Sequence, residues 1–269
     1  MIFDFIMKIC VLLSCMYQTD YSIIEKSNIQ SDVVVVNQCD VDDIAEFDFE
    51  NKYGKICHVK FISTQERGLS KSRNMAIRNT SADICLIADD DEYFFDGYED
   101  RILSAFQNDY KSDFIAFKLE YAKKFFAEKE YKMKFFDVPR LCSVQMAFRR
   151  DKIIKEEIFF DELMGSGSGN GSGEEIKFAM QCFKRGLKMK YIPILIAKIN
   201  EGSESRWFKG YTVEYFKNLG WSSRRIFGLC WGIIYLFYHA LSHQKLYRPH
   251  MSFGGTLKYL YLGFFEKRQ

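Results

Sequence analysis

The sequence predicts an α/β fold, a mostly parallel sheet flanked by helices, followed by a C-terminal helical appendage. Three observations indicate this. Short apolar or β-branched runs alternate with segments of helical length up to about residue 200. The chain of 269 residues can bury a large core. From Gly210 the alternation gives way to longer apolar and aromatic segments. We therefore expect one domain over residues 1–215 and a basic, aromatic helical segment over residues 216–269.

The first predicted strand, residues 9–14, ends at Ser14 and Cys15. The residues before it are as apolar as a signal peptide, but Asp4 lies where a signal would carry positive charge. The sequence leaves open whether translation starts at Met1 or Met7. Two more strands, residues 31–40 and 57–64, stop at polar residues, as strands buried on both faces do.

Helical segments connect these strands, one at residues 21–29 and another that starts near Ser70, a plausible N-cap, and runs to Asn79. A fourth strand, residues 84–88, follows. Beyond it the sequence predicts a helix at 98–108, strands at 113–121 and 142–150, a helix from Glu174 to Gly186, and a strand at 188–199.

Glycine occupies every odd position of "GSGSGNGSG", residues 165–173. Composition alone is equally compatible with a flexible linker between domains. The run lies inside the alternating pattern, however, with a helix and a strand directly after it. This position favours a mobile active-site loop.

Three adjacent acids, Asp89, Asp90 and Asp91, follow the fourth strand. Adjacent carboxylates raise one another's pKa unless a cation or several donors compensate. One alternative is a solvated turn in which Asp90 or Asp91 caps the next helix. Ligands of parallel sheets bind beyond the carboxyl ends of the strands, however. Asp89 and Asp91 can turn to one side and engage Mg²⁺ or Mn²⁺, whose other ligands would be phosphate oxygens.

Composition restricts the class of protein. Apolar content of 48% and charged content of 28% fit an ordered globular chain. The eight cysteines are scattered without a Cys-x-x-Cys pair, which favours reduced, buried thiols in the cytosol. The net charge of +2 hides an asymmetry, because residues 206–269 carry ten Lys or Arg against two acids, Glu214 and Glu266.

The C-terminal segment contains a 16-residue apolar run, 226–241, flanked by basic residues and followed by "GGTLKYLYLGFFEKR". The run is shorter than the roughly 20 residues of a spanning helix. Apolar and aromatic side chains beside Lys and Arg are typical of segments at the surface of anionic membranes. The alternative is a helical hairpin packed on the main domain. A nucleic-acid partner is not expected, because the basic residues form no solvated stripe.

Four motifs in order, the strand ending at Ser14-Cys15, "ERGLSKSRNMAI", "ADICLIADDDEYF" and "GSGNGSGEEIKF", resemble bacterial family 2 glycosyltransferases over roughly residues 8–215. The similarity is greatest to enzymes of capsule, lipopolysaccharide or exopolysaccharide synthesis. The resemblance implies a GT-A fold and inverting transfer from a nucleoside-diphosphate sugar, with UDP-sugars expected. It also implies a divalent metal, a glycan or lipid-linked glycan acceptor, and a cytoplasmic enzyme peripheral to the inner face of the cell membrane.

Residue roles follow from the same resemblance. Asp89 and Asp91 match the D-x-D acids, with Asp89 and Asp90 toward the donor and Asp91, together with Asp89, toward the metal. Arg73 matches an arginine that contacts the donor nucleotide, a role in which Lys71 would assist. Asp40, at the end of the second strand, matches an acid near the base or ribose, although a turn residue is equally compatible with its position.

The acidic pair Glu174 and Glu175 matches the family's general base, and the resemblance aligns Glu175 with the base itself. Trp207 would stack on an acceptor sugar ring or pack in the core. Where some relatives carry a metal-binding histidine after the last strand, this chain has Lys198, Ile199 and Asn200. The pair His239 and His243 lacks a third ligand and is interpreted as interface histidines.

Two alternatives remain at this point. A nucleotide-sugar-binding scaffold without catalysis could share the fold. A metal-dependent nucleotidyltransferase would release pyrophosphate, but "SCMYQTD" after the first strand offers no glycine-rich triphosphate loop. The donor sugar, acceptor, linkage and oligomeric state cannot be derived from the sequence.

Overall fold

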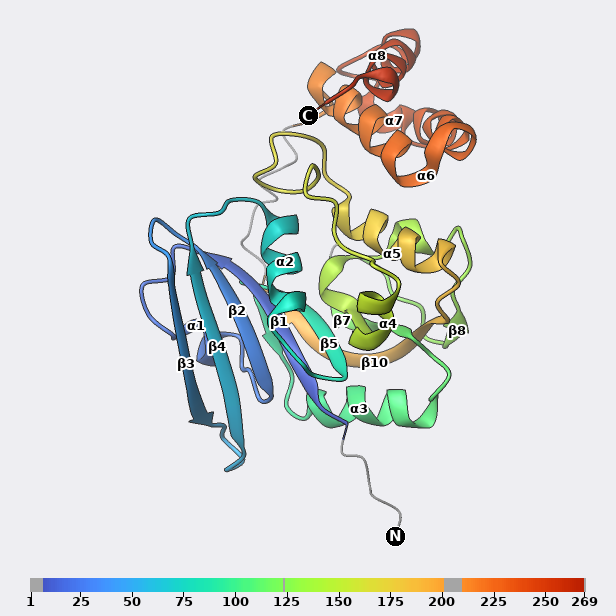
Figure 1. Cartoon of the computed structure of the whole chain (residues 1–269). Coiled ribbons are helices and arrows are strands. Elements are labelled where there is room, and N and C mark those ends of the chain that lie inside the picture. Colours follow the sequence, from blue (N-terminus) through green and yellow to red (C-terminus); the bar gives the residue numbers. More distant parts are fainter. Residues whose placement is uncertain (1–6, 123, 201–209, 269) are drawn as a thin grey trace.

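A computed structural model describes residues 7–122, 124–200 and 210–268 (Figure 1). Over these residues a ten-stranded sheet has the order β3-β4-β2-β1-β5-β9-β7-β10-β6, with β8 paired to β10 beside this path. The strands are β1 (Ile9–Met16), β2 (Asp32–Gln38), β3 (Asp43–Glu50), β4 (Ile56–Thr64), β5 (Ile84–Asp89), β6 (Glu92–Phe94), β7 (Phe114–Glu120), β8 (Tyr131–Lys132), β9 (Met146–Arg149) and β10 (Met189–Ile199).

Helices flank this sheet and form the C-terminal part of the chain (Figure 1). They are α1 (Ile23–Lys26), α2 (Leu69–Arg78), α3 (Tyr98–Asn108), α4 (Arg150–Lys155), α5 (Glu174–Lys184), α6 (Val213–Ser242), α7 (Gln244–Tyr247) and α8 (Phe253–Phe265), with short 3₁₀ turns at Val138–Arg140 and Ser143–Gln145. The predicted α/β fold class is therefore confirmed.

Four neighbouring strands, β4, β2, β1 and β5, form a parallel block. Strand β1 pairs in parallel with β2 and β5, and β2 pairs in parallel with β4. Strands β1, β2 and β5 are buried on both faces, which explains their uninterrupted apolar sequences. Strands β3, β6, β8 and β9 join the sheet in antiparallel pairs, so the whole sheet is mixed. Strand β3 was not predicted, because four of its eight residues are acidic and none is buried.

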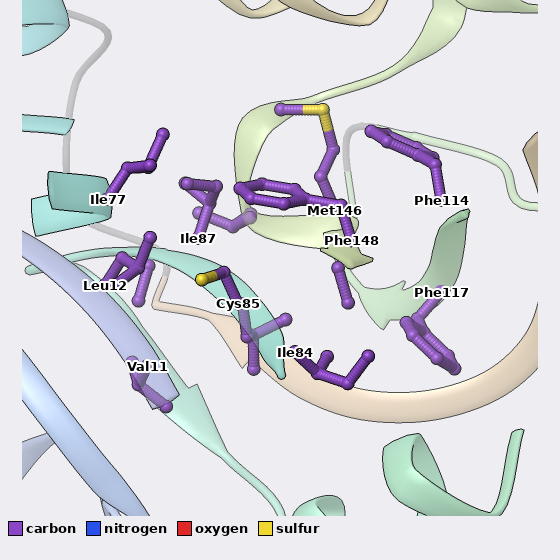
Figure 2. Close-up of a cluster of buried hydrophobic side chains, with 14 of the residues drawn as sticks. Val11, Leu12, Ile77, Ile84, Cys85, Ile87, Phe114, Phe117, Met146 and Phe148 are labelled. Carbon is purple, nitrogen blue, oxygen red and sulfur yellow. The ribbon is translucent and has the colours of Figure 1, made fainter. Parts of the chain in front are cut away.

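The main core fills the space between the sheet and its helices. Figure 2 shows apolar side chains from several strands gathered there, among them Leu12 of β1, Ile87 of β5 and Phe148 of β9. Ile77 of α2 lies in the same cluster and is fully buried. This packing holds β1, β5 and α2 in fixed positions, and the site lies at their ends.

Two local predictions were wrong. Ser70 is not an N-cap, because α2 begins at Leu69 after Gly68, whose φ of 127° suits glycine. The Ser70 hydroxyl instead donates to the carbonyl oxygen of Met164 at 2.8 Å. The segment predicted as a strand at 142–150 contains a 3₁₀ turn, the four-residue strand β9 and the start of α4.

The C-terminal helices form a separate small core. Phe216 and Leu236 of α6 pack there with Tyr247 of α7 and with Leu260 and Phe264 of α8. The N-terminal half of α6 also reaches the main core, to which it contributes Trp221, Ile226 and Phe227. The division at residue 215 stays a prediction. Figure 1 shows these helices at the end of the sheet near the loop of residues 165–173.

Candidate active site

Strands β1 and β5 end side by side, which fixes the position of the aspartates. Ser14 of β1 is opposite Asp89 of β5 in the parallel register. The buried Ser72 of α2 donates a hydrogen bond to Ser14 at 2.7 Å. Helix α2 is thereby held over the carboxyl ends of these two strands, and the next residue along it is Arg73.

Arg73 connects the two acidic motifs. Its side chain is 1% exposed, and its guanidinium donates from Nη2 to both carboxylate oxygens of Asp89 at 2.9 and 3.1 Å. Nη1 donates to Oε1 of Glu174 at 3.1 Å. Burial disfavours the charged guanidinium, but the carboxylates of Asp89 and Glu174 outweigh it and raise the pKa of Arg73. The expected contact of Arg73 with a donor stays a prediction, and in this structure its side chain joins two carboxylates.

The acidic pair at the start of α5 has two different environments. Glu174 is buried, and its Oε2 accepts a hydrogen bond from the Gly173 amide at 3.1 Å while Oε1 accepts from Arg73. Glu175 is partly buried, and burial followed by the charge of Glu174 raises its pKa well above that of an ordinary glutamate. A carboxyl group whose pKa lies nearer neutrality is suited to general-base chemistry.

The aspartates continue into a fourth acid that the sequence analysis did not single out. Glu92 is 1% exposed, and neither of its carboxylate oxygens has a hydrogen-bond partner. Burial and the charges of Asp89 and Asp91 raise its pKa strongly. The sequence signal that could have pointed to Glu92 is the unbroken run "DDDE", in which Glu92 directly follows the three aspartates and begins β6.

The acids of this cluster can be compared with the ligands that a divalent metal ion requires. Within the described residues, no three or more His, Cys, Asp or Glu side chains are grouped as a complete metal site. Mg²⁺ is usually held by one or two carboxylates together with substrate phosphates and water. The acids Asp89 and Asp91 offer such ligands, and the buried Glu92 beside them has two carboxyl oxygens without a hydrogen-bond partner. The residues present therefore fit a metal that binds together with its substrate.

The predicted donor residues Asp40 and Lys71 form ion pairs with residues outside this cluster. Asp40 is exposed and accepts a hydrogen bond from Arg67 at 2.7 Å. The Lys71 ammonium lies 3.8 Å from Glu66 and is half-buried. Asp90 is exposed in the turn between β5 and β6. Trp207, the predicted acceptor residue, lies outside the described residues.

The glycine run is packed against Glu174 and against the start of α2. Gly165, Gly167, Gly169 and Gly173 have φ values of 93°, 83°, 75° and 100°, which explains the alternation of glycine in the sequence. A Cβ on Gly165 would lie 3.0 Å from the Glu174 carboxyl carbon. The Leu69 amide at the start of α2 donates to the Ser166 carbonyl at 2.9 Å. The run connects elements of one fold and is not a linker between domains, while its mobility stays a prediction.

A second ion network, which the sequence analysis missed, links α5 to the C-terminal helices. Asp161 accepts from Lys177 of α5 at 2.6 Å and from Arg225 of α6 at 2.5 Å and 2.8 Å. Burial opposes ionisation of Asp161, but these two cations lower its pKa. The three residues are 16 and 64 positions apart, so no local sequence pattern could have revealed them.

His239 and His243, interpreted as interface histidines, stack with ring centroids 4.1 Å apart in the C-terminal helices. Burial and the neighbouring His243 lower the pKa of His239 to about 4. Both lie in a helical core far along the chain from the aspartates, and they take no part in the acidic cluster.

The sheet is open, and carboxylates and a buried arginine lie beyond the carboxyl ends of its parallel strands, where folds of this class bind their ligands. The family model of glycosyl transferase family 2 matches residues 14–162, more than half of the chain. The chain therefore belongs to glycosyl transferase family 2, and its family supports glycosyltransferase activity. At the level of sequence, no protein of curated function matches it.

Solved structures show the same fold. Residues 1–349 of S. aureus TarS in complex with UDP-GlcNAc superpose with a TM-score of 0.64 at 14% identity, covering 94% of this chain and 78% of that chain. The complex of the same protein with UDP gives a TM-score of 0.62 at 14% identity, with the same coverage. At this identity the similarity establishes the shared fold.

Proposed function

We propose that this glycosyltransferase moves a sugar, with inversion, from a nucleoside-diphosphate sugar to a lipid-linked glycan acceptor in surface polysaccharide synthesis. The observation that carries the proposal is the double contact of Arg73 with Asp89 and Glu174. It brings the D-x-D acids and the acidic pair, which are about 85 residues apart, to one edge of the sheet. The UDP-GlcNAc complex of TarS, which shares this fold, supports a UDP-sugar as donor.

The donor would bind beyond the ends of β1 and β5. Asp91 and Asp89 would hold Mn²⁺ or Mg²⁺, which when bound supplies positive charge to the departing diphosphate. Asp90, Lys71 and Asp40 would line the nucleotide side of the site. Arg73 is fully buried and paired with two carboxylates, and its role would be to position Asp89 and Glu174.

Glu175 would be the general base. The oxygens of Glu174 already accept hydrogen bonds from Arg73 and from the Gly173 amide, which hold its carboxyl group in place. The raised pKa of Glu175 suits acceptance of a proton from the acceptor hydroxyl as that oxygen attacks the anomeric carbon. Trp207 would stack on the acceptor sugar.

The basic C-terminal helices support an acceptor at a membrane and a peripheral position at the cytoplasmic face. Residues 210–268 carry eight Lys or Arg against two acids. Such segments are attracted to anionic lipid.

The proposal is tested by incubating the protein and Mn²⁺ with UDP-, GDP- and CDP-sugars in turn, with bacterial membrane lipids as acceptor. We expect release of one nucleoside diphosphate, and chelation of the metal should abolish it. In a parallel incubation with a nucleoside triphosphate, release of pyrophosphate would instead identify a nucleotidyltransferase. Binding of a nucleotide sugar without turnover, together with cellular function that survives Glu174→Ala and Glu175→Ala, would identify a scaffold.

A further inference from the structure

The C-terminal half of α6 exposes an uncharged face. From Ile226 to Gln244 the chain has no Asp, Glu, Lys or Arg. Large apolar side chains point outward along this stretch, including Ile234 at 55%, Phe237 at 52% and Leu241 at 63% exposure. Isolated exposed apolar residues are ordinary, but a continuous helical face without charge indicates an interaction surface.

Helix α8 extends this face. Tyr261, Leu262 and Phe265 are exposed on it. An apolar groove of about 390 Å³ runs between the two helices, lined by Ile233 and Phe237 of α6 and by residues of α8. The helices are in close contact, because a Cβ on Gly220 or Gly263 would lie within about 2 Å of backbone atoms of the other helix. The surface is therefore built on a closely packed hairpin of α6 and α8, called the C-terminal hairpin below.

Basic side chains border this apolar face. Arg224 lies before it, Lys245 and Arg248 follow it, and Lys258 lines the groove itself; all four are exposed. An apolar centre with a cationic border is complementary to an anionic bilayer, whose headgroups attract the cations while apolar side chains enter the acyl boundary. A second copy of the chain would bring the same positive borders together, which disfavours it as the occupant.

The length of the helices determines how they can meet a bilayer. Taken as one 30-residue helix, α6 is long and apolar enough to cross a membrane. Its helical geometry breaks at Gly228, however, where φ is 81° and ψ is −167°. The preceding half is fixed to the main core by Ile226 and Phe227 and by the Arg225 contact with Asp161. The remaining 14 residues would extend only about 21 Å, less than the roughly 30 Å of a hydrocarbon core.

We propose that the face formed by residues 229–241 of α6 and 261–265 of α8 inserts into an anionic lipid bilayer, with both helices in the plane of the interface and neither crossing it. This deepens the membrane partner named in the proposed function. Only the link between the membrane and the acceptor rests on the proposed function.

The same helix touches the candidate site. A Cβ on Gly171 would lie 2.2 Å from the Ser222 hydroxyl of α6, and one on Gly173 would lie 3.1 Å from Ile226. The glycine run, which also contacts Glu174, therefore packs directly on the half of α6 that precedes the inserted face. Docking of this face would bring the acidic edge of the sheet, which carries Asp89, Asp91 and Glu174, toward the bilayer, where a lipid-linked acceptor lies.

The first test is flotation of the full chain with vesicles of phosphatidylcholine, with and without phosphatidylglycerol. We expect binding to the anionic vesicles only, and its loss in Phe237→Glu combined with Ile234→Glu. The control is Tyr110→Glu, which places the same charge at a 72% exposed residue after α3. Replacing Lys245 or Arg248 by Gln should weaken binding about fivefold each.

The second test measures depth. Cys230→Trp and Leu241→Trp, each in a Trp231→Phe background whose remaining fluorescence from Trp207 and Trp221 is subtracted, place a fluorophore at two exposed positions on nearly the same side of the helix. Quenching by lipids brominated at known depths should report equal depths if the helix lies in the plane. A crossing helix would separate them by about 16 Å along its axis, and that result would overturn in-plane insertion.

Failure of wild-type binding, binding that survives the double Glu variant, or a dimer in solution that this variant dissociates would overturn the proposal. Neither test contains donor, acceptor or metal. Their failure would therefore leave sugar turnover untouched, and failure of turnover would leave vesicle binding untouched.

Discussion

The acidic edge and the C-terminal hairpin depart from the usual distribution of side chains in opposite directions. At the edge, ionisable side chains are inside: Arg73, Glu174 and Glu92 are each at least 94% buried. On the hairpin, apolar groups are outside, with Phe237 and Leu241 more than half exposed. Buried charges require partners, and exposed apolar faces require something to cover them.

The difference shows that the two regions require different kinds of partner. Arg73 and Glu174 compensate each other within the fold, whereas Glu92 has no hydrogen-bond partner. The edge is thus mostly organised before any ligand arrives. The hairpin has its own small core, but nothing in the chain's described residues covers its outer face. Variants in each region should therefore fail in different assays.

The largest expected effect concerns Glu175. Glu175→Gln removes a general base but keeps the size and polarity of the side chain, so sugar transfer should fall by about 10²–10⁴-fold. The measurement is release of nucleoside diphosphate, with binding of the donor as the control. Equal donor affinity in the variant would show that the edge itself is intact.

The pH profile sharpens this prediction. Because the base acts when deprotonated and burial raises the pKa of Glu175, kcat/KM should rise with pH, with a midpoint above the ordinary 4.5 of glutamate. This rising limb of the pH profile should disappear in Glu175→Gln. If Glu174→Gln removes the limb and Glu175→Gln keeps it, the roles of the two acids are reversed.

The next effect concerns Arg73 and is measured as the free energy of unfolding. Arg73→Met leaves Asp89 and Glu174 without their shared cation, and removing one member of a buried ion pair costs about 3–5 kcal/mol. The matched control is Arg67→Met, because the Arg67 contact with Asp40 is exposed and such pairs contribute about 1 kcal/mol or less. Similar losses in both variants, in denaturant unfolding, would refute the view that the edge depends on its buried arginine.

A smaller effect in the glycine run separates the cost of backbone strain from the cost of a clash with Glu174. Both Gly165→Ala and Gly169→Ala place a side chain in the left-handed region, at a cost of about 1–3 kcal/mol in stability. Only the new methyl group at residue 165 meets Glu174, while nothing lies within 4 Å at residue 169. Gly165→Ala should therefore reduce turnover beyond the shared loss of stability. Equal turnover of the two variants would show that contact with Glu174 is not needed.

The smallest effect on stability is expected on the hairpin. Phe237→Ser changes an exposed side chain and should alter the free energy of unfolding by no more than about 0.5 kcal/mol. Turnover of a donor in detergent should also be unchanged, while vesicle binding should fall. A large loss of stability would mean that this face packs against the protein itself.

The fold could be predicted from the sequence because buried parallel strands give continuous apolar runs, as in β1, β2 and β5. Strand β3 escaped prediction because its alternation is dominated by acids, and the break of α6 at Gly228 leaves no clear trace in an apolar run. The identities of Asp89, Arg73 and Glu174 as candidates were available from the motifs. Their contacts were not, since Arg73 and Glu174 are 101 residues apart.

Calorimetric titration with UDP, in the presence and absence of Mn²⁺, tests most directly that the acidic edge is a donor site. We predict metal-dependent binding that Asp91→Asn abolishes and that Asp100→Asn, a change of an exposed acid on α3, leaves unchanged. Metal-dependent UDP binding of equal strength in all three proteins would contradict the assignment of Asp91. No binding of UDP, GDP or CDP by the folded wild-type protein would contradict the donor site as a whole.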